Sequence, residues 1–369
     1  VPSISLNNMN DANELISFIA SMSGEGNLRV EENLGEGYVR LRVSEAERRQ
    51  AKHDIQHVED IVIEMLRNAR DAGADRVYLA TTKEEGVRTL LFLDNGSGVP
   101  QDMQERIFDA RVTSKLESMK MDRWGVHGRG MALFSIKQNT DEARVVTSGV
   151  DLGSAFKVCV ATDHLGERAD QSSWPQAVKD EDGRYVCARG PHNIIRAACE
   201  FALEELRSCD VYLGSPSEIA ATLYAQASSR LDTSRLLFID DECELPVIDR
   251  LGLASDAEDF IRICSGLGLE MSERTAHRIL SGQIKPVRGV TARLLRERDS
   301  TSHASAPVDL AKDRRGLRIA KDDMAQFSRA VERDFNDLAA RYYLNLCGDP
   351  KIRVSRDRIT VTFDLAKEE

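Results

Sequence analysis

Apolar side chains recur at helical spacing through residues 44–72, the longest periodic stretch in the first part of the chain. Ser44 is a favourable N-cap residue, and the acidic Glu45 and Glu47 fall in the first turn that follows it. Gly73 is placed to end the stretch, because glycine readily adopts the left-handed conformation that terminates helices. The pattern predicts one or two helices here.

Strand-like segments flank this helical stretch. Residues 28–43 alternate between apolar and polar around a Gly-Glu-Gly turn, which is typical of a β-hairpin. Further along, the pattern predicts strands at 76–80 and 89–93, a short helix at 100–106, a polar loop at 111–123, a helix at 130–139, and strands at 143–147 and 155–161. This order predicts an α+β fold, a two-layer α/β sandwich with helices on one face of a mixed, mostly antiparallel sheet.

The second half of the chain is less regular. Residues 163–189 are charged, with a turn at 180–183, and we expect a domain boundary inside them. The later pattern predicts helices at 193–207 and 216–229, strands at 211–213 and 236–239, helical structure at 255–299, a linker at 299–307, a long helix at 322–346, and a hairpin of strands 351–354 and 358–363. We therefore expect a first domain at 1–165, a βα unit at 190–250 and a mainly helical region at 251–369.

Composition narrows the class of protein. The 369 residues are 41% hydrophobic, enough for a sizeable core, and no apolar run approaches the roughly 18 residues that cross a bilayer. Seven cysteines without CxxC spacing indicate reduced thiols, and no signal peptide is recognisable, so we expect a cytoplasmic protein without membrane contact. A net charge of −11 disfavours a broad nucleic-acid surface.

Glu64 and Asn68 lie four residues apart on a predicted helix, so they share a face. A carboxylate there can orient a water for attack on a γ-phosphate, and an amide oxygen is a suitable ligand for Mg²⁺. An ordinary exposed polar face is the alternative for this pair taken alone. Asp71 points elsewhere on the helix and serves either the helix end or the site.

Asp94 follows the predicted strand 89–93 and precedes Gly96 and Gly98. A carboxylate at a strand end can accept a hydrogen bond from the exocyclic amine of adenine, and the glycines allow a base to approach closely. A plain turn is the alternative, because Asp-Asn-Gly is common turn chemistry.

Three glycines, Gly125, Gly128 and Gly130, precede an apolar helical segment at 131–136. Backbone amides in such a turn, together with the helix N-terminus, form a cradle for anions. The segment is not a Walker A motif, since no Gly-Lys-Ser/Thr follows, and no predicted strand leads directly into it as in a Rossmann fingerprint.

Together the three segments resemble the ATP-binding (Bergerat) fold of the GHKL superfamily, which includes DNA gyrase B, heat-shock ninety chaperones, sensor histidine kinases and MutL mismatch-repair proteins. Residues 64–73 resemble its N-box, residues 94–98 its G1 box and residues 125–130 its G2 box. Residues 113–115, Thr-Ser-Lys, resemble the MutL form of the mobile ATP lid, and Ser154 follows a glycine where the family often has Gly-Thr. The resemblance covers about residues 40–162.

The resemblance implies roles for individual residues. Glu64 would be the general base, Asn68 would hold Mg²⁺, and Asp94 would bind adenine. Lys115 and the backbone amides of Gly128, Arg129 and Gly130 would contact the phosphates. The remaining residues of the implied ATP site are Asp71, Gly96, Gly98, Thr113, Ser114, Gly125, Val126, His127 and Ser154.

Glu64 favours the hydrolytic branch of the superfamily, because histidine kinases do not use a hydrolytic glutamate at that position. The nearby His53 and His57 lie on or against the N-box helix, where surface or packing roles suit them better than phosphorylation. The resemblance therefore implies a Mg²⁺-dependent ATPase whose nucleotide state drives a conformational switch or dimer closure, with an unknown protein partner. A histidine or serine kinase is the less favoured alternative, and residues 190–250 would form a transducer-like unit.

Residues 260–282 also fit a helix-turn-helix, and Ser-x-x-Thr-Ala-x-Arg at 272–278 is similar to the recognition helix of repressors. Lys285, Arg288 and Arg293 add local positive charge. An ATP-responsive DNA-binding or regulatory protein that uses residues 260–293 is thus a second hypothesis, although a packed helical hairpin is favoured over DNA binding.

Overall fold

The computed structural model describes residues 30–114, 120–127, 130–168, 170–231 and 241–295, together with parts of 324–367. The chain forms two compact units, Val1–Asp299 and Ser300–Glu369, which are described separately. No helix among the described residues has the length and apolar composition needed to cross a membrane.

The first unit contains helices and strands in alternation. Its helices are α2 (Glu45–Asp54), α3 (Val58–Asp71), α4 (Ala132–Asn139), α5 (Ile194–Glu204), α6 (Pro216–Arg230), α8 (Ala257–Gly266) and α9 (Glu273–Leu280), with short 3₁₀ turns η1 (Gln101–Met103), η2 (Arg106–Phe108), η3 (Glu242–Glu244) and η4 (Arg250–Leu253). Its strands are β1 (Val30–Gly35), β2 (Tyr38–Leu41), β3 (Arg76–Glu84), β4 (Val87–Asp94), β5 (Val112–Thr113), β6 (Lys120–Asp122), β7 (Gly125–His127), β8 (Glu142–Ser148), β9 (Ser154–Ala161), β10 (Gln176–Lys179), β11 (Tyr185–Arg189) and β12 (Asp210–Gly214).

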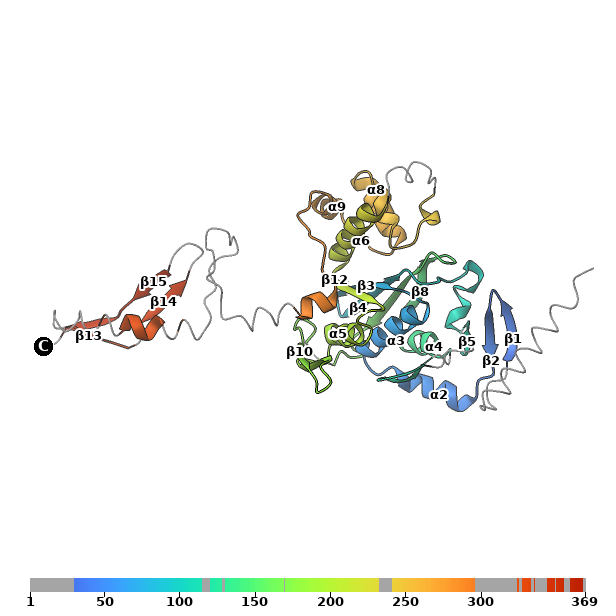
Figure 1. Ribbon diagram of the computed structural model, residues 1–369, viewed down its shortest axis with the longest axis horizontal. Coiled ribbons are helices and arrows are strands. Elements are labelled where there is room, and N and C mark those ends of the chain that lie inside the picture. The colour runs from blue at the N-terminus through green and yellow to red at the C-terminus, as the bar shows by residue number, and fades with distance from the viewer. Residues whose placement is uncertain are drawn as a thin grey trace, which may run out of the picture. The chain divides into compact units, whose positions relative to one another are not determined.

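A five-stranded sheet in the order β12-β3-β4-β9-β8 forms the centre of this unit (Figure 1). The strand β12 runs parallel to β3, and the other neighbours are antiparallel. The mixed sheet packed against helices confirms the predicted α+β class. Residues 190–250, for which we expected a separate βα unit, contribute β12 to this same sheet, because β12 pairs along its whole length with β3.

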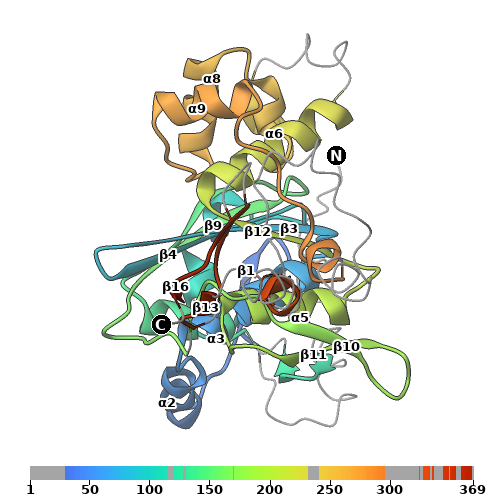
Figure 2. The same ribbon diagram turned by 90° about the vertical axis from the view of Figure 1, so that its left-hand side faces the viewer.

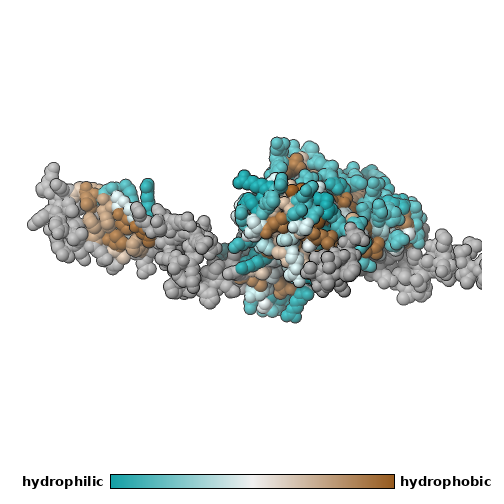
Figure 3. Space-filling model, turned by 90° about the horizontal axis from the view of Figure 1, so that it is seen from above, coloured by the Kyte–Doolittle hydropathy of each residue, from teal (hydrophilic) through white to brown (hydrophobic). Residues whose placement is uncertain are grey.

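Helices cover both faces of the sheet, as two views related by a 90° turn show (Figures 1 and 2). Alternate residues of β3 and β4 join different clusters: Val77 and Phe92 pack with α3, α4 and α5, whereas Tyr78 and Leu93 pack with α6, α8 and α9. The prediction placed helices on one face of the ATP-binding sandwich. The structure adds a second helical layer on the opposite face, and hydrophilic residues predominate on the outer surface of that layer (Figure 3).

Local signals set several element boundaries as predicted. Ser44 caps α2 through a reciprocal capping box with Glu47. Gly73 follows α3 with φ of +77°, the left-handed conformation expected at a helix end. The hairpin β1–β2 turns at residues 35–37 as expected.

Some segments differ from the prediction. Residues 163–189 contain the hairpin β10–β11 around the expected turn at 180–183, and residues 111–123 contain the strands β5 and β6. The strands β5 and β6 are only two and three residues long, and β10 and β11 carry one fully buried residue between them, so no clear apolar alternation marks these segments. Residues 236–239, expected as a strand, lie outside the described residues.

The second unit contains two small strand pairs. The predicted terminal hairpin is confirmed as β14 (Lys351–Val354) and β15 (Ile359–Thr362). Residues 344–346, expected at the end of a long helix, instead form β13 (Leu344–Leu346), which pairs with β16 (Leu365–Lys367). The ring of Phe335 stacks on Phe363 with centroids 4.0 Å apart, which ties the helical segment to the strands.

Candidate functional site

A cavity of about 490 Å³ opens beside α3, between α2, α4 and the ends of β4 and β9. This volume lies within the range of small-molecule sites in proteins. The cavity brings together many residues that the sequence predicted for an ATP site: Glu64, Asn68, Asp71, Asp94, Gly98, Thr113, Ser114, Gly130 and Ser154.

Asp94 occupies the last position of β4, where it is paired in register with Ser154 at the first position of β9. Both residues are buried, with Asp94 only 4% exposed. The Asp94 carboxylate accepts a hydrogen bond from the backbone N–H of Gly96 at 2.8 Å, and the Ser154 hydroxyl lies 3.0 Å from the Ser148 hydroxyl. A buried carboxylate and a hydroxyl therefore stand together on the cavity wall.

Gly98 is required by the protein's own backbone. It has φ of +69°, and a Cβ at this position would lie 1.8 Å from the carbonyl oxygen of Gly149. Gly153 is similarly constrained, since a Cβ there would lie 2.1 Å from the carbonyl oxygen of Asp94. Gly98, which the sequence predicted to allow a base to approach, therefore also lets the loop after β4 contact the loop after β8, and Gly153 lets the loop after β8 approach Asp94.

Glu64 and Asn68 both line the cavity from α3, as their spacing predicts. The side-chain Nδ2 of Asn68 is buried without a hydrogen-bond partner in the structure. A buried amide of this kind fits a ligand that enters the cavity, because buried polar groups are normally paired.

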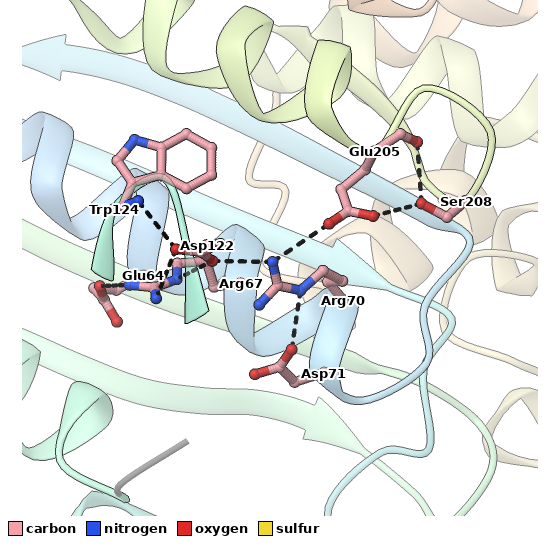
Figure 4. Close-up of polar contacts among 8 residues, drawn as sticks. All are labelled: Glu64, Arg67, Arg70, Asp71, Asp122, Trp124, Glu205 and Ser208. Carbon is pink, nitrogen blue, oxygen red and sulfur yellow. Dashed lines mark hydrogen bonds and ion pairs between the residues drawn. The ribbon is translucent and has the colours of Figure 1, made fainter. Parts of the chain in front are cut away.

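Glu64 is held by a neighbouring arginine on the same helix (Figure 4). The Arg67 guanidinium donates to Glu64 Oε1 at 2.7 Å and, through Nε and Nη2, to both oxygens of Asp122 at 2.9 and 3.0 Å. Asp122 lies at the end of β6, so this pairing fixes the β6–β7 hairpin against α3. The Arg67 side chain is only 3% exposed, which makes the interaction a buried one.

Arg70, one helical turn after Arg67, extends this network. It donates to Asp71 at 2.9 Å, to Asp122 at 3.1 Å and to Glu205 at 3.3 Å, beyond the end of α5 (Figure 4). Burial alone lowers the pKa of Arg70, but these carboxylates outweigh it and raise the pKa above its usual value. The prediction assigned Asp71 to ATP binding, and the structure shows it both lining the cavity and pairing with Arg70.

Three further residues line the cavity that no sequence pattern marked as site residues: Arg111, Glu47 and Tyr38. Arg111 is 6% exposed and forms an ion pair with Glu47 of α2. Its φ of +63° is in the left-handed region, which costs a non-glycine residue roughly 1–2 kcal/mol. Burial raises the pKa of Tyr38, and a hydrogen bond with Ser114 partly opposes this shift.

The predicted G2 segment divides into two parts. Gly125, Val126 and His127 form β7, which pairs with β6, so a strand occupies part of the expected turn. Gly130 has φ of +66° and lines the cavity immediately before α4. Lys115, Gly128 and Arg129 lie outside the described residues, so their predicted phosphate contacts stay predictions.

The region around the cavity is similar to known proteins. Residues 55–158 match the family described as histidine kinase-, DNA gyrase B-, and HSP90-like ATPase. The matched segment begins at the cavity-lining Ile55, contains α3, the end of β4 and α4, and reaches into β9. It therefore spans the elements that place Glu64, Asn68 and Asp94.

The similar curated proteins include DNA mismatch repair proteins MutL. The MutL of Brucella abortus (strain S19) is 36% identical over 112 residues, which are 30% of this chain and 18% of that protein. The MutL of Thermodesulfovibrio yellowstonii is 31% identical over 107 residues, 28% of this chain and 19% of that protein. The chain thus matches about a fifth of the length of these relatives.

Among solved structures, full-length ShkA in complex with AMPPNP is 14% identical, with a TM-score of 0.23, over 78% of this chain and 67% of that chain. A likeness at this level supports no inference about the site. The segment that matches the family model contains the predicted N-box and G1 box. The resemblance read from the sequence is therefore confirmed for one segment: residues 55–158 match the histidine kinase-, DNA gyrase B-, and HSP90-like ATPase family.

Proposed function

We propose that this protein binds ATP with Mg²⁺ in the cavity beside α3 and hydrolyses it slowly to drive a conformational switch. One observation carries the proposal: Asp94, Glu64 and Asn68, which are separated in sequence, line a single cavity of nucleotide size. The match of residues 55–158 to an ATPase family supports ATP binding and a switch in general terms.

Asp94 would select adenine. It is the buried acceptor at the end of β4, and an exocyclic amine is the complementary donor. An apolar base also needs apolar walls, and the cavity supplies them from Met65, Phe92, Val99, Ile107 and Phe156. A buried carboxylate beside such walls discriminates strongly against bases that cannot donate to it.

Asn68 would hold Mg²⁺ through its amide oxygen. No group of three or more His, Cys, Asp or Glu side chains suited to a metal occurs among the described residues. Mg²⁺ commonly relies on one or two protein oxygens together with substrate phosphates and water, so a single amide is compatible with it. When bound, the ion would neutralise phosphate charge.

Glu64 would act as general base and orient the attacking water. Its ion pair with Arg67 holds the carboxylate at a fixed position on the cavity wall. Fixed positioning is the main contribution a protein makes to phosphoryl transfer, since reactants held in line lower the barrier without new covalent chemistry.

Phosphate release in the presence of Mg²⁺ tests this role. Glu64→Gln is expected to bind ATP and lose turnover by at least about a hundredfold, the usual contribution of a general base. Glu142→Gln, a surface substitution on β8 away from the cavity, serves as the control and should turn over normally. Retention of turnover in Glu64→Gln would remove Glu64 from the proposed role.

The switch would involve the loop 111–123 and the β6–β7 hairpin. Asp122 docks this hairpin on α3 through Arg67, which also holds Glu64. Displacement of the β6–β7 hairpin would therefore remove Asp122 from Arg67, the residue that holds the proposed general base Glu64. Dimer closure on ATP would appear as a larger sedimentation coefficient with a non-hydrolysable ATP analogue; an unchanged monomer would rule closure out.

Nucleic-acid binding through α9 is a second candidate function, because the structure leaves the basic face of this helix open. Arg274, His277 and Arg278 are exposed on α9, and with Glu273, Ser281 and Gln283 they line an open groove. Ala276 and Ile279 on the opposite face are buried in the second helical layer. Duplex DNA binding at low salt that weakens in Arg274→Ala/Arg278→Ala would support this function, and absence of binding would refute it.

A further inference from the structure

Negative charge dominates the described wall of the cavity. Five carboxylates line it, from Glu47, Asp54, Glu64, Asp71 and Asp94. A nucleotide triphosphate brings further negative charge into this space, so cations on the wall are needed to offset the repulsion.

Two guanidinium groups line the cavity among the described residues, and they differ in their partners. Arg67 is engaged by Glu64 and, through two hydrogen bonds, by Asp122. Within the described part of the chain, Arg111 forms an ion pair with Glu47 alone, and its Nε is buried without a hydrogen-bond partner. Because a buried charged donor is normally paired, Arg111 is the cation whose environment is completed by an incoming anion.

The backbone of Arg111 connects three elements that surround the cavity. Its N–H donates to the carbonyl of Gly130 at 2.8 Å, and its carbonyl accepts from the N–H of Leu41 on β2 at 2.9 Å. A Cβ at Gly130 would lie 3.1 Å from the carbonyl carbon of Arg111, so the glycine permits this close approach. Arg111 is therefore fixed beside the loop that leads into α4.

The conformation of Arg111 sets it apart from similar residues. The other described non-glycine residues with positive φ are Glu36, Glu85 and Asp151. These three are exposed and lie in turns, whereas Arg111 is buried at the cavity. A strained backbone that the surrounding structure maintains is common at ligand sites.

Glu47 is bound at both ends of its carboxylate. One oxygen accepts from the backbone N–H and the hydroxyl of Ser44 at 2.8 and 2.9 Å, and the other accepts from Arg111. The hydrogen bonds from Ser44 hold the Glu47 side chain at the start of α2 whether or not Arg111 remains paired with it. Loss of the ion pair would therefore leave α2 intact and remove the contact between α2 and the segment that contains Arg111.

We propose that Arg111 binds the phosphate groups of the nucleotide, and that these phosphates displace Glu47 as its partner. This proposal rests on the proposed ATP site and adds to it a phosphate ligand and the contact that responds to nucleotide. Binding would break the link between α2 and the β5 segment, and release would restore it. Phosphate binding at Arg111 would thus change the contacts of α2, which carries Glu47.

Nucleotide titrations of Arg111→Ala, with ATP and with adenosine, separate this role from a general packing role. The affinity for ATP should fall by about tenfold or more, as for loss of a charge-assisted hydrogen bond. The affinity for adenosine, which has no phosphate, should stay unchanged. Arg144→Ala removes an exposed cation of β8 and should leave both affinities as in the natural protein.

Two further variants keep the test valid if Arg111→Ala does not fold. Arg111→Asn removes the charge with a residue that tolerates the left-handed backbone, and it should reproduce the selective loss of ATP affinity. Glu47→Gln retains a capping-box residue at α2 but removes the competing charge, so it should raise ATP affinity.

Three results would overturn the inference. One is unchanged ATP affinity in a folded Arg111 variant, another is an equal loss of ATP and adenosine affinity, and the third is a lower ATP affinity in Glu47→Gln. Failure of the natural protein itself to bind ATP would instead overturn the proposed function, and with it this inference.

Discussion

Asp122 stabilises the domain by compensating two buried arginines, and its removal gives the sharpest energetic prediction. The carboxylate is 6% exposed and accepts from Arg67 Nε and Nη2 at 2.9 and 3.0 Å, from Arg70 Nη1 at 3.1 Å, and from the N–H of Trp124 at 3.0 Å. Asp122→Ala removes two hydrogen bonds from Arg67, which keeps its ion pair with Glu64, and weakens the compensation of Arg70.

The expected loss is large relative to the stability of a domain. Removing one partner of a buried ion pair costs about 3–5 kcal/mol, because a charge stays buried without full compensation. Native domains have free energies of unfolding of about 5–15 kcal/mol, so this loss is a substantial fraction of the total. At roughly 2–4 °C for each kcal/mol, the melting temperature should fall by about 10 °C.

Urea unfolding, followed by circular dichroism, measures this loss directly. Glu142→Ala is the matched control, because it removes a carboxylate from an ion pair with Arg144 in which both side chains are well exposed. Such surface pairs contribute about 0–1 kcal/mol, so the control should unfold nearly as the natural protein does. A loss below about 1 kcal/mol in Asp122→Ala would contradict the docking of the β6–β7 hairpin on α3.

Two other predictions concern the folded state. Gly98→Ala should destabilise the protein far more than Gly86→Ala, because both glycines have positive φ but only Gly98 faces a backbone oxygen within 1.8 Å of the added Cβ; similar losses of about 1 kcal/mol in thermal unfolding would contradict this. Burial raises the pKa of Tyr78 to about 12 from 10.0, so the folded state retains the proton longer than the unfolded state. The contribution of the protonated Tyr78 to the free energy of unfolding is complete below pH 10. It is lost as the pH rises towards 12, by about 1.4 kcal/mol for each pH unit. Tyr78→Phe should therefore make the free energy of unfolding fall less steeply with pH, and an unchanged slope would exclude Tyr78 as the source of the fall.

Local patterns in the sequence predicted those candidate residues whose placement at the cavity depends on a single helix or strand. Glu64 and Asn68 share a face of one helix, and Asp94 ends a strand followed by glycines, so short-range patterns were sufficient to predict both. The contact of Arg111 with Glu47 joins residues 64 positions apart, and the contact of Arg70 with Glu205 joins residues 135 positions apart. Such pairs depend on tertiary packing, which no local pattern specifies.

The second helical layer had a signal that the prediction did not use. Residues 77–80 and 90–93 are continuous apolar runs, and runs without alternation are typical of strands buried on both faces. Both segments are buried throughout, with Val77 and Tyr78 directed to opposite clusters. What no local pattern specified was that α6, α8 and α9 are the elements that cover the second face.

Titration of ATP with Mg²⁺ into the natural protein and into Asp94→Asn, followed by calorimetry, tests the central claim most directly. The account predicts saturable binding to the natural protein and its loss in Asp94→Asn. The amide has a single acceptor oxygen where the carboxylate has two, one of which accepts from the Gly96 N–H, and its NH2 group is a donor that repels the adenine amine. Thermal unfolding of both proteins establishes that the variant is folded. Equal ATP affinity in the two proteins, or no binding by the natural protein, would contradict the assignment of this cavity as an adenine nucleotide site.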